Sequence, residues 1–255
     1  MVSNRFSAAA DTYDRHARPQ LTLAQSVLSM LPELYPEQIL ELGSGTGLLT
    51  RLLTERFPDV PIHAVDISEK MVEHSRAKFL TDSNIKWIVD DAQTFWSGDR
   101  YPLIVSSSAL HWVTDLRATC DNIFQSLEPG GTFSLGMMLR GSLKELHELR
   151  IAIAPEKTPS ITLPTYEEVK AYLQAAGFNL ERRKHSEEEI IYDDAKSFFK
   201  AIHEQGVTGG KVSAGNAPLT RSELSQLVVD YQETYASNGG VSATYETAMF
   251  LLTKT

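Results

Sequence analysis

The stretch that decides the fold is Gln38-Ile39-Leu40-Glu41-Leu42-Gly43-Ser44-Gly45-Thr46-Gly47-Leu48-Leu49. Its apolar run, residues 39–42, is bounded by turn signals and predicts a buried parallel strand. Three glycines follow at alternate positions, where the lack of a Cβ permits a sharp turn and lets a ligand touch the backbone. Apolar residues at helical spacing begin at Leu48. A strand, a glycine turn and a helix in this order predict the nucleotide-binding crevice of an open α/β sheet.

The spacing of the glycines bears on which nucleotide binds there. The dinucleotide fingerprint is G-x-G-x-x-G, whereas this chain has G-x-G-x-G, with Leu48 where the third glycine would fall. Glu41 at the end of the strand would repel a pyrophosphate, so a ligand that carries positive charge fits better. The pattern E-x-G-x-G-x-G resembles the first motif of the class I S-adenosylmethionine-dependent methyltransferases. Their cofactor has a sulfonium and an ammonium group and no phosphate.

Length and composition limit the class of protein. The 255 residues suffice for one α/β domain with insertions, and the net charge of −9 argues against a general nucleic-acid binder. Cys120 is the single cysteine, which excludes an internal disulfide and fits a reducing compartment; its helical neighbours predict burial rather than reactivity. We find no signal peptide and no run long enough to span a membrane. We therefore expect a cytoplasmic protein without nucleic-acid or membrane partners, and we assign no residue to a metal.

Strand and helix patterns alternate along the chain and predict a Rossmann-like α/β fold. We expect a doubly wound, mostly parallel sheet of seven strands whose last strand is antiparallel. The strands are predicted at 39–42, 60–65, 85–89, 103–107, 132–137, 178–192 and 243–254. The helices are predicted at 6–31 (divided at Pro19), from 48, and at 69–79, 115–127, 143–153, 166–176, 194–205 and 221–235. In a single domain, 1–36 form N-terminal helices, 37–138 the cofactor-binding core, and 139–164 with 193–242 inserted substrate-side or lid segments.

The predicted cofactor residues lie at the ends of the first four strands. Asp66 comes about 20 residues after the glycine turn, where an acidic side chain accepts hydrogen bonds from both ribose hydroxyls. This position is shared by NAD enzymes, so it does not choose between the two cofactors. In the methyltransferase pattern, Asp91 accepts from the adenine amino group and Ala92 leaves room for the ring; a solvated helix start is the alternative for Asp91. The cofactor set is therefore Glu41, Gly43, Gly45, Gly47, Asp66, Asp91, Ala92 and Ser107.

Five further features resemble the malonyl-acyl-carrier-protein O-methyltransferases of biotin synthesis and run almost from end to end. They are Phe6-x-x-x-Ala10-x-x-Tyr13-Asp14-x-His16-Ala17-x-x-Gln20, Ala109-Leu110-His111-Trp112-Val113, Arg140-Gly141-Ser142-Leu143-Lys144-Glu145-Leu146, the helix that ends at Gly206, and Ala243-Thr244-Tyr245-Glu246. The resemblance implies methyl transfer from S-adenosylmethionine to the free carboxylate of a malonyl thioester on acyl carrier protein, or on coenzyme A. Such a carboxylate is already ionised at neutral pH, so no general base is required.

The same resemblance suggests which residues meet the substrate. Tyr13 and His16 share a face of the N-terminal helix with Gln20 and are expected to cap the pocket; a helix that only packs on the sheet is the alternative. Trp112 follows the fourth strand, whose carboxyl end faces the substrate in such sheets. Arg140 follows the fifth strand, and a guanidinium holds a carboxylate in two bonds, although a plain surface charge explains it equally well. We therefore predict Tyr13, His16, Trp112 and Arg140 as the catalytic set.

Acyl carrier proteins are acidic, so docking on this acidic chain needs a local basic patch. The residues that could supply it are Arg182, Arg183 and Lys184 together with Lys196 and Lys200, for which a solvated surface is the commoner meaning.

Other functions remain in competition. The nearest is a small-molecule carboxylate methyltransferase of the trans-aconitate type, which predicts equal activity on free acids. A nicotinamide oxidoreductase is disfavoured by the glycine spacing, by Glu41 and by Asp91-Ala92. A cofactor-sensing module would keep the cofactor motifs but lose the substrate residues, and here all of them are present. Nucleic-acid amino-methyltransferases carry an Asn/Asp-Pro-Pro-aromatic run where this chain reads Ser107-Ser108-Ala109-Leu110.

Overall fold

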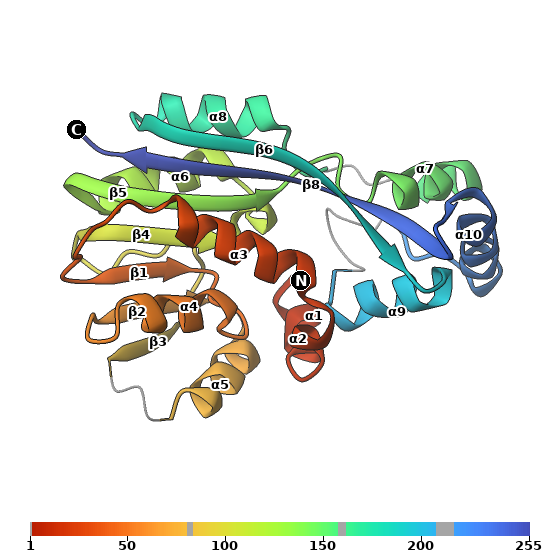
Figure 1. Ribbon diagram of the computed structural model, residues 1–255, viewed down its shortest axis with the longest axis horizontal. Coiled ribbons are helices and arrows are strands. Elements are labelled where there is room, and N and C mark those ends of the chain that lie inside the picture. Colours follow the sequence, from red (N-terminus) through yellow and green to blue (C-terminus); the bar gives the residue numbers. More distant parts are fainter. Residues whose placement is uncertain (1, 81–83, 158–161, 208–216) are drawn as a thin grey trace.

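The computed structural model describes residues 2–80, 84–157, 162–207 and 217–255. Its centre is a sheet with the strand order β3-β2-β1-β4-β5-β8-β6 (Figure 1). The strands are β1 (Ile39–Leu42), β2 (Ile62–Asp66), β3 (Ile85–Val89), β4 (Tyr101–Ser107), β5 (Leu127–Met138), β6 (Asn179–Tyr192) and β8 (Gly240–Thr253). The first five pair in parallel, whereas β8 runs antiparallel to both β5 and β6. The predicted fold class is confirmed.

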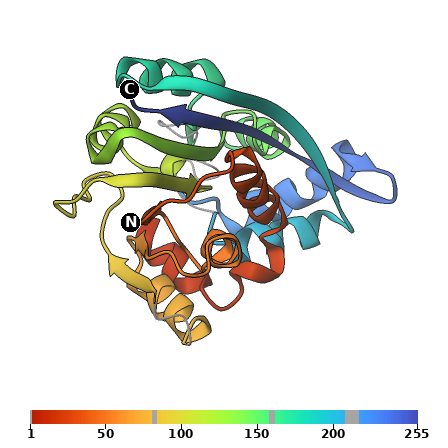
Figure 2. The same ribbon diagram turned by 60° about the vertical axis from the view of Figure 1, so that its left-hand side comes forward.

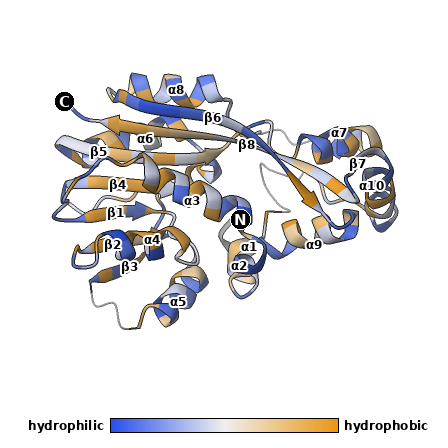
Figure 3. Ribbon diagram, in the orientation of Figure 1, coloured by the Kyte–Doolittle hydropathy of each residue, from blue (hydrophilic) through white to orange (hydrophobic). Residues whose placement is uncertain are grey.

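Helices cover both faces of this sheet, as alternating side-chain directions along each strand require. On one face, α3 (Arg18–Met30) and α4 (Leu48–Arg56) form a core with β1, to which Ile39 contributes; α5 (Glu69–Lys78) packs beside β2 and β3. On the other face, α6 (Leu116–Ser126) and α8 (Tyr166–Ala175) form a second core that includes Leu40. Figure 3 shows the apolar colour concentrated on the central strands and the hydrophilic colour along much of β6.

The strands β6 and β8 extend well beyond the other strands, as Figure 2 shows from the side. β5 pairs with β8 only over Thr132–Met138, whereas β6 accompanies β8 as far as Val241. The helices α7 (Lys144–Ile153), α9 (Ala195–Glu204) and α10 (Arg221–Thr234) pack on the extension. They enclose a third apolar core, which includes Phe198 and Tyr231. In the described ranges, no helix is long and apolar enough to cross a membrane.

Several boundaries differ from the sequence expectation, each for a local reason. The N-terminal region divides close to Pro19, which lies in the first turn of α3, where its missing N–H costs nothing. A further break, not predicted, separates α1 (Val2–Ala9) from α2 (Tyr13–His16). The predicted turn at 128–131 lies within β5, because Leu127 already pairs with Tyr101.

An additional strand, β7 (Ala236–Ser237), forms a hairpin with β8. Asn238 and Gly239 join the two strands with φ of 46° and 86°, the left-handed conformations that a two-residue type I′ turn needs. The asparagine–glycine pair was therefore a hairpin signal in the sequence. Residues 158–161 of the predicted loop 155–164, and 209–216 of the loose stretch 209–218, lie outside the described residues.

Candidate active site

A cavity of about 420 Å³ lies at the carboxyl ends of the central strands. The glycine turn after β1 and the loops after β2, β3 and β4 contribute to its wall, and Phe6 and Tyr13 of α1 and α2 close it on another side. Of the predicted cofactor residues, the cavity is lined by Gly43, Gly45, Asp66, Asp91, Ala92 and Ser107. The sequence therefore placed six of its eight cofactor candidates on one cavity wall.

The three glycines all have positive φ, and their surroundings differ. A Cβ on Gly43 would lie 2.0 Å from the Cβ of Ala109, so the turn after β1 touches the loop after β4. A Cβ on Gly45 would meet nothing within 4 Å, consistent with its place on the cavity wall. Gly47 does not line the cavity; its missing Cβ makes room for the Phe79 ring, 2.6 Å from the ideal position. Gly47 thus serves the packing of the turn.

Asp66 holds the wall of the cavity in place. One carboxylate oxygen, Oδ2, accepts a hydrogen bond from the N–H of Gly45 at 2.8 Å, and Oδ1 accepts from the N–H of Ser68 at 2.8 Å. Burial raises the pKa of Asp66, and the two backbone N–H groups oppose that rise. A carboxylate has about four lone-pair sites, so two acceptor positions remain for ribose hydroxyls.

Glu41 lies beneath the cavity and does not line it. Its side chain points from β1 toward α4, where Oε2 accepts a hydrogen bond from the Thr50 hydroxyl at 2.7 Å. The other oxygen, Oε1, is buried and has no hydrogen-bond partner among the described residues. Burial, with a smaller contribution from the negative charge of Asp66, raises the pKa of Glu41 to about 8. The structure therefore makes Glu41 a neutral, buried acid at neutral pH rather than a direct cofactor contact.

Glu41→Gln is expected to change how stability depends on pH. Between the ordinary pKa near 4.5 and the folded-state value of about 8, the folded chain keeps a proton that the unfolded chain releases, so stability falls as pH rises. Glutamine keeps an acceptor for Thr50 without that proton. The variant should therefore gain stability relative to wild type, by roughly 1.4 kcal/mol for each unit of pKa shift, as the pH rises from 5 to 8.

The check is chemical denaturation of the cofactor-free protein at several pH values. Glu37→Gln, an exposed position just before β1, is the control and should leave the profile unchanged. Parallel profiles for wild type and Glu41→Gln would show that Glu41 is ionised throughout.

The loops after β3 and β4 form part of the cavity wall. Asp91 accepts a hydrogen bond from the N–H of Gln93 at 2.9 Å within a turn, not at a helix start. Gln93 in turn holds the neighbouring loop: its Oε1 accepts from the N–H and the hydroxyl of Thr114 at 2.9 and 2.7 Å and from the N–H of Asp115 at 3.0 Å. Gln93 lines the cavity, and nothing in the local sequence singled it out.

Tyr13 and Trp112 line both this cavity and a smaller cavity of about 30 Å³. The two cavities share Phe6, Tyr13, Gln20, Ser108 and Trp112. Phe6 and Trp112 pack edge to face with ring centroids 5.3 Å apart. Burial and the nearby charges of Asp66 and Asp14 raise the pKa of Tyr13, so its hydroxyl stays protonated. The smaller cavity adds residues from distant segments, among them Ser142, Gln205 and Tyr245.

His16 and Arg140 lie outside both cavities, contrary to the sequence expectation. His16 Nε2 lies 2.5 Å from Oε2 of Glu204 on α9. Arg140 turns toward α8: its Nε donates to the Leu163 carbonyl at 3.1 Å and an Nη donates to Glu168 at 3.0 Å. The helix face of His16 and the strand-end position of Arg140 set where each backbone lies. The distant carboxylates of Glu204 and Glu168 set where the two side chains point.

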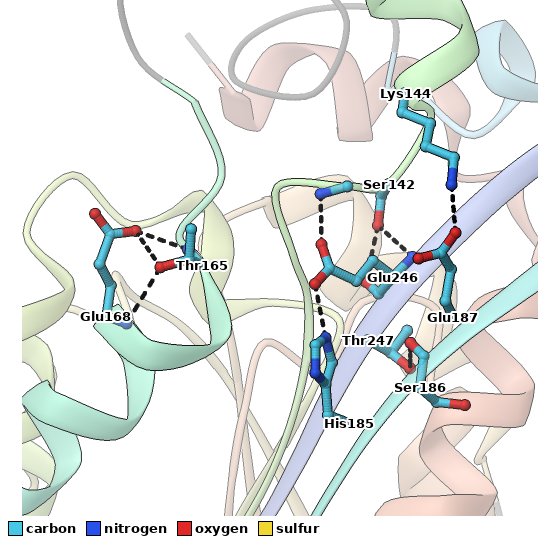
Figure 4. A network of polar contacts seen from close by, with 10 residues as sticks. Ser142, Lys144, Thr165, Glu168, His185, Ser186, Glu187, Glu246 and Thr247 are labelled. Carbon is cyan, nitrogen blue, oxygen red and sulfur yellow. Dashed lines mark hydrogen bonds and ion pairs between the residues drawn. The ribbon is translucent and has the colours of Figure 1, made fainter.

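The loop after β5 is fixed by Glu246 of β8 (Figure 4). One Glu246 oxygen accepts from the N–H of Gly141 at 2.5 Å and the other lies 2.7 Å from Nε2 of His185. Ser142 and the Glu246 backbone exchange two hydrogen bonds, at 2.8 and 3.0 Å. Leu143 follows with φ of 56°, and both Ser142 and Leu143 line the smaller cavity. Glu246 therefore positions one wall of that cavity, a role that the sequence did not suggest.

Comparison with known proteins adds to this geometry. The model of a family described as a methyltransferase domain matches residues 39–131. The S-adenosylmethionine-dependent methyltransferase of Mesorhizobium loti has the same fold, with a TM-score of 0.54 at 17% identity, covering 90% of this chain and 96% of that one. This chain is an S-adenosylmethionine-dependent methyltransferase. The N-methyltransferase NodS of Bradyrhizobium japonicum, solved with S-adenosylhomocysteine, also has the fold of this chain. The TM-score is 0.54 at 14% identity, covering 94% of this chain and 87% of that one.

Curated relatives match the methyltransferase from end to end. A malonyl-[acyl-carrier protein] O-methyltransferase of Priestia megaterium is 28% identical over 100% of this chain and 97% of its own length. Proteins with the same name from Acetivibrio thermocellus and Geobacter sulfurreducens are 28% and 27% identical, each over 96% of this chain and over 90% and 94% of their own lengths. The resemblance seen in the sequence is confirmed.

The cavity of the methyltransferase fits S-adenosylmethionine. The hydroxyl oxygens of Ser44, Ser107 and Ser108 are buried beside it without a hydrogen-bond partner in the described part of the chain. Such groups each cost about 1–3 kcal/mol when they stay unpaired, so a polar ligand is expected to pair with them. The described lining includes Asp66 and Asp91 but neither lysine nor arginine, which suits a ligand with a sulfonium and an ammonium group. No set of three or more described His, Cys, Asp or Glu residues is placed to hold a metal ion.

Proposed function

We propose that this methyltransferase esterifies the free carboxylate of a malonyl thioester carried by acyl carrier protein. The observation that carries the proposal is the full-length match to relatives of that name. The general methyltransferase domain ends at residue 131, yet Tyr13, Gln20, Ser142, Gln205 and Tyr245 of the smaller cavity all lie outside it. The relatives therefore match the segments that form the smaller cavity, which we call the substrate end, and not only the cofactor core.

The chemistry requires positioning rather than proton transfer. When bound, S-adenosylmethionine supplies an electrophilic methyl group. The malonyl carboxylate is ionised at neutral pH, so the chain needs to hold one oxygen in line with that methyl and to exclude water. Phe6 and Trp112 form an apolar cover over the junction of the two cavities. Because no lysine or arginine is present in the described lining, we assign the orientation of the carboxylate to neutral donors, first of all the protonated hydroxyl of Tyr13.

The remaining predicted residues bind the cofactor or support the site in this proposal. Gly43, Gly45, Asp66, Asp91, Ala92 and Ser107 contact the cofactor, while Glu41 and Gly47 support the turn from below. His16 lies next to Glu204 of α9 and Arg140 donates to Glu168 of α8, so both residues support neighbouring helices. A cytoplasmic location stays a prediction from the sequence.

Tyr13→Phe and Arg140→Ala together separate direct from indirect roles. Phenylalanine keeps the ring and removes the donor, and a hydrogen bond to a charged group is worth about 1.5–3 kcal/mol, so kcat/KM for the malonyl thioester should fall by about 10–100-fold. The Kd for S-adenosylmethionine should stay within about twofold, because the ring that lines the cavity is unchanged. Arg140→Ala should lower kcat/KM by less than about threefold, since the Arg140 and Glu168 side chains are each about half exposed and their ion pair is screened by solvent.

Steady-state kinetics and titration calorimetry on the same preparations make this check. A larger effect at Arg140 than at Tyr13 would restore the arginine as the carboxylate contact and contradict the assignment to Tyr13.

The substrate itself is tested by a side-by-side assay with methyl-labelled S-adenosylmethionine. Malonyl-acyl carrier protein, malonyl-coenzyme A and trans-aconitate are offered at equal concentration. We expect base-labile label on the malonyl carrier protein, well above the others. Equal label on trans-aconitate would favour the small-molecule carboxylate methyltransferase. Label on none of the three, with tight cofactor binding, would leave the methyltransferase assignment intact and remove the malonyl substrate.

A further inference from the structure

The structure separates the basic residues that the sequence grouped together. Arg182, Arg183 and Lys184 lie on β6, where Arg183 pairs with Phe250 of β8. The strands β8 and β5 lie between β6 and the cavity-lining end of β4. Lys196 and Lys200 lie instead on α9, which contacts α2 (Figure 1). The two groups of basic residues therefore lie on different parts of the protein surface.

α9 has one apolar and one basic side. Ala195, Phe198, Ala201 and Ile202 are buried in the third core. The exposed Lys196 and Lys200 are four residues apart and lie on the same side of the helix, followed by His203. On the neighbouring elements, Arg15 of α2 and Arg18 at the start of α3 are also exposed. We call Arg15, Arg18, Lys196 and Lys200 the α2–α9 basic face.

Hydrogen bonds join the two elements of this face. The hydroxyl of Thr12 donates to the Glu204 carbonyl at 2.9 Å, and His16 lies 2.5 Å from the Glu204 carboxylate. The side chain of Gln205 donates to the backbone carbonyl of His16. Burial raises the pKa of Tyr192, just before α9, while the charge of Arg18 opposes the rise, which places that charge near the same helix.

Two of the acids nearby, Glu204 and Asp14, lie next to cations or a histidine. Glu204 lies next to His16 and, at 3.9 Å, to Lys200; Asp14 binds Lys78 at 2.5 Å and the Thr46 hydroxyl at 2.5 Å. The carboxylate of Asp194 accepts from the N–H of Ser197 at the start of α9. Within the described residues, no ion pair is formed by Arg15, Arg18 or Lys196. Asp193 and Asp194 at the start of α9 are exposed as well, so the face also carries negative charge. Arg15, Arg18 and Lys196 nevertheless keep charges that the acids of a partner could pair with, on a chain of net charge −9.

The inner sides of α2, α3 and α9 form part of the wall of the smaller cavity. Tyr13 of α2, Gln20 of α3 and Gln205 at the end of α9 line the smaller cavity. Gln20 donates to Gln205 at 3.3 Å, so the walls are joined as well. A protein bound on the outer side would thus lie one helix away from the point where a malonyl carboxylate is held.

We propose that the α2–α9 basic face docks an acidic surface of the acyl carrier protein that delivers the thioester. This inference rests on the proposed function. Complementary charge steers association and fixes orientation, and its effect falls with salt. The basic residues of β6 are not part of the dock; on an edge strand, charged side chains keep other strands from pairing.

The test compares two double variants with the same change in charge. Arg15→Glu with Lys196→Glu alters the α2–α9 basic face, and Arg182→Glu with Arg183→Glu alters the β6 edge. Thermal unfolding and the Kd for S-adenosylmethionine establish that each variant is folded. The substrates are the malonyl thioester of acyl carrier protein and that of N-acetylcysteamine, which lacks a protein. Affinity for the malonyl carrier protein is measured directly at low and high salt.

We expect the α2–α9 variant to lower kcat/KM for the carrier thioester by about tenfold or more at low salt, with a smaller loss at high salt. Its activity on the small thioester should stay within about twofold, and the β6 variant should match wild type on both. An equal loss on both thioesters, or a loss of carrier affinity confined to the β6 variant, would overturn the docking site. If wild type methylates neither thioester, the proposed function fails, and the affinity measurement still decides where the carrier binds.

Discussion

Asp66→Asn is expected to weaken S-adenosylmethionine binding by about 100-fold or more, because it removes charge-assisted hydrogen bonds worth about 1.5–3 kcal/mol each. The carboxylate accepts from the N–H groups of Gly45 and Ser68 and keeps lone pairs for the ribose. An asparagine offers one oxygen and one NH₂, so whichever way it turns, the NH₂ faces a backbone N–H. The variant thus loses an anchor of the glycine turn and an acceptor for the ligand at once.

Calorimetric titration with S-adenosylmethionine and S-adenosylhomocysteine measures the effect. Asp59→Asn removes the same charge at an exposed position before β2 and should leave both affinities unchanged. A Kd for Asp66→Asn within threefold of wild type would show that this carboxylate does not hold the cofactor.

Gly43→Ala should destabilise the fold by about 2–4 kcal/mol, from overpacking and from a left-handed backbone. The new Cβ would lie 2.0 Å from that of Ala109, and φ at Gly43 is 76°. Gly98→Ala isolates the backbone contribution, because φ there is 87° and nothing lies within 4 Å of the added Cβ. The compensating pair Gly43→Ala with Ala109→Gly removes the clash alone and should fall to the level of Gly98→Ala.

Urea denaturation of the four proteins gives the comparison, with cofactor affinity as a second measurement. If the compensating pair is no more stable than Gly43→Ala, the contact between the turn and the loop after β4 is not what requires a glycine at this position.

The parts of the fold that follow from local pattern were predictable. The β1 strand and its glycine turn combine an apolar run with residues that tolerate positive φ, and Asp66 follows from its spacing to that turn. The β7–β8 hairpin was also within reach, because Asn238-Gly239 is a strong local signal. Some boundaries were not predictable. The start of β5 is one of them, because pairing with β4 extends the strand into the predicted turn.

The candidate site likewise has residues whose position could be predicted and residues whose direction could not. Residues on strand ends, such as Asp91 and Ser107, reach the cavity because backbone position alone puts them there. The direction of His16 depends on Glu204, 188 residues away, and that of Arg140 on Glu168 of α8. The charge of Glu41 suggested a ligand contact. The alternation of side-chain directions along β1 instead points this side chain toward Thr50. These directions are long-range properties, and no local pattern encodes them.

The central place of β8 has a consequence for how the chain acquires its structure during synthesis. β5 and β6 do not pair with each other; each pairs with β8, whose residues emerge from the ribosome roughly 100 residues after those of β5. Until Gly240–Thr253 has been made, both strands present open edges that invite pairing with other chains. The apolar face of α9 also stays exposed until β8 has been made, because Phe198 packs in the core that Val241 and Ala243 complete. We therefore expect the nascent protein to have its cofactor half nearly assembled while the apolar surface of its substrate half is still exposed to aggregation.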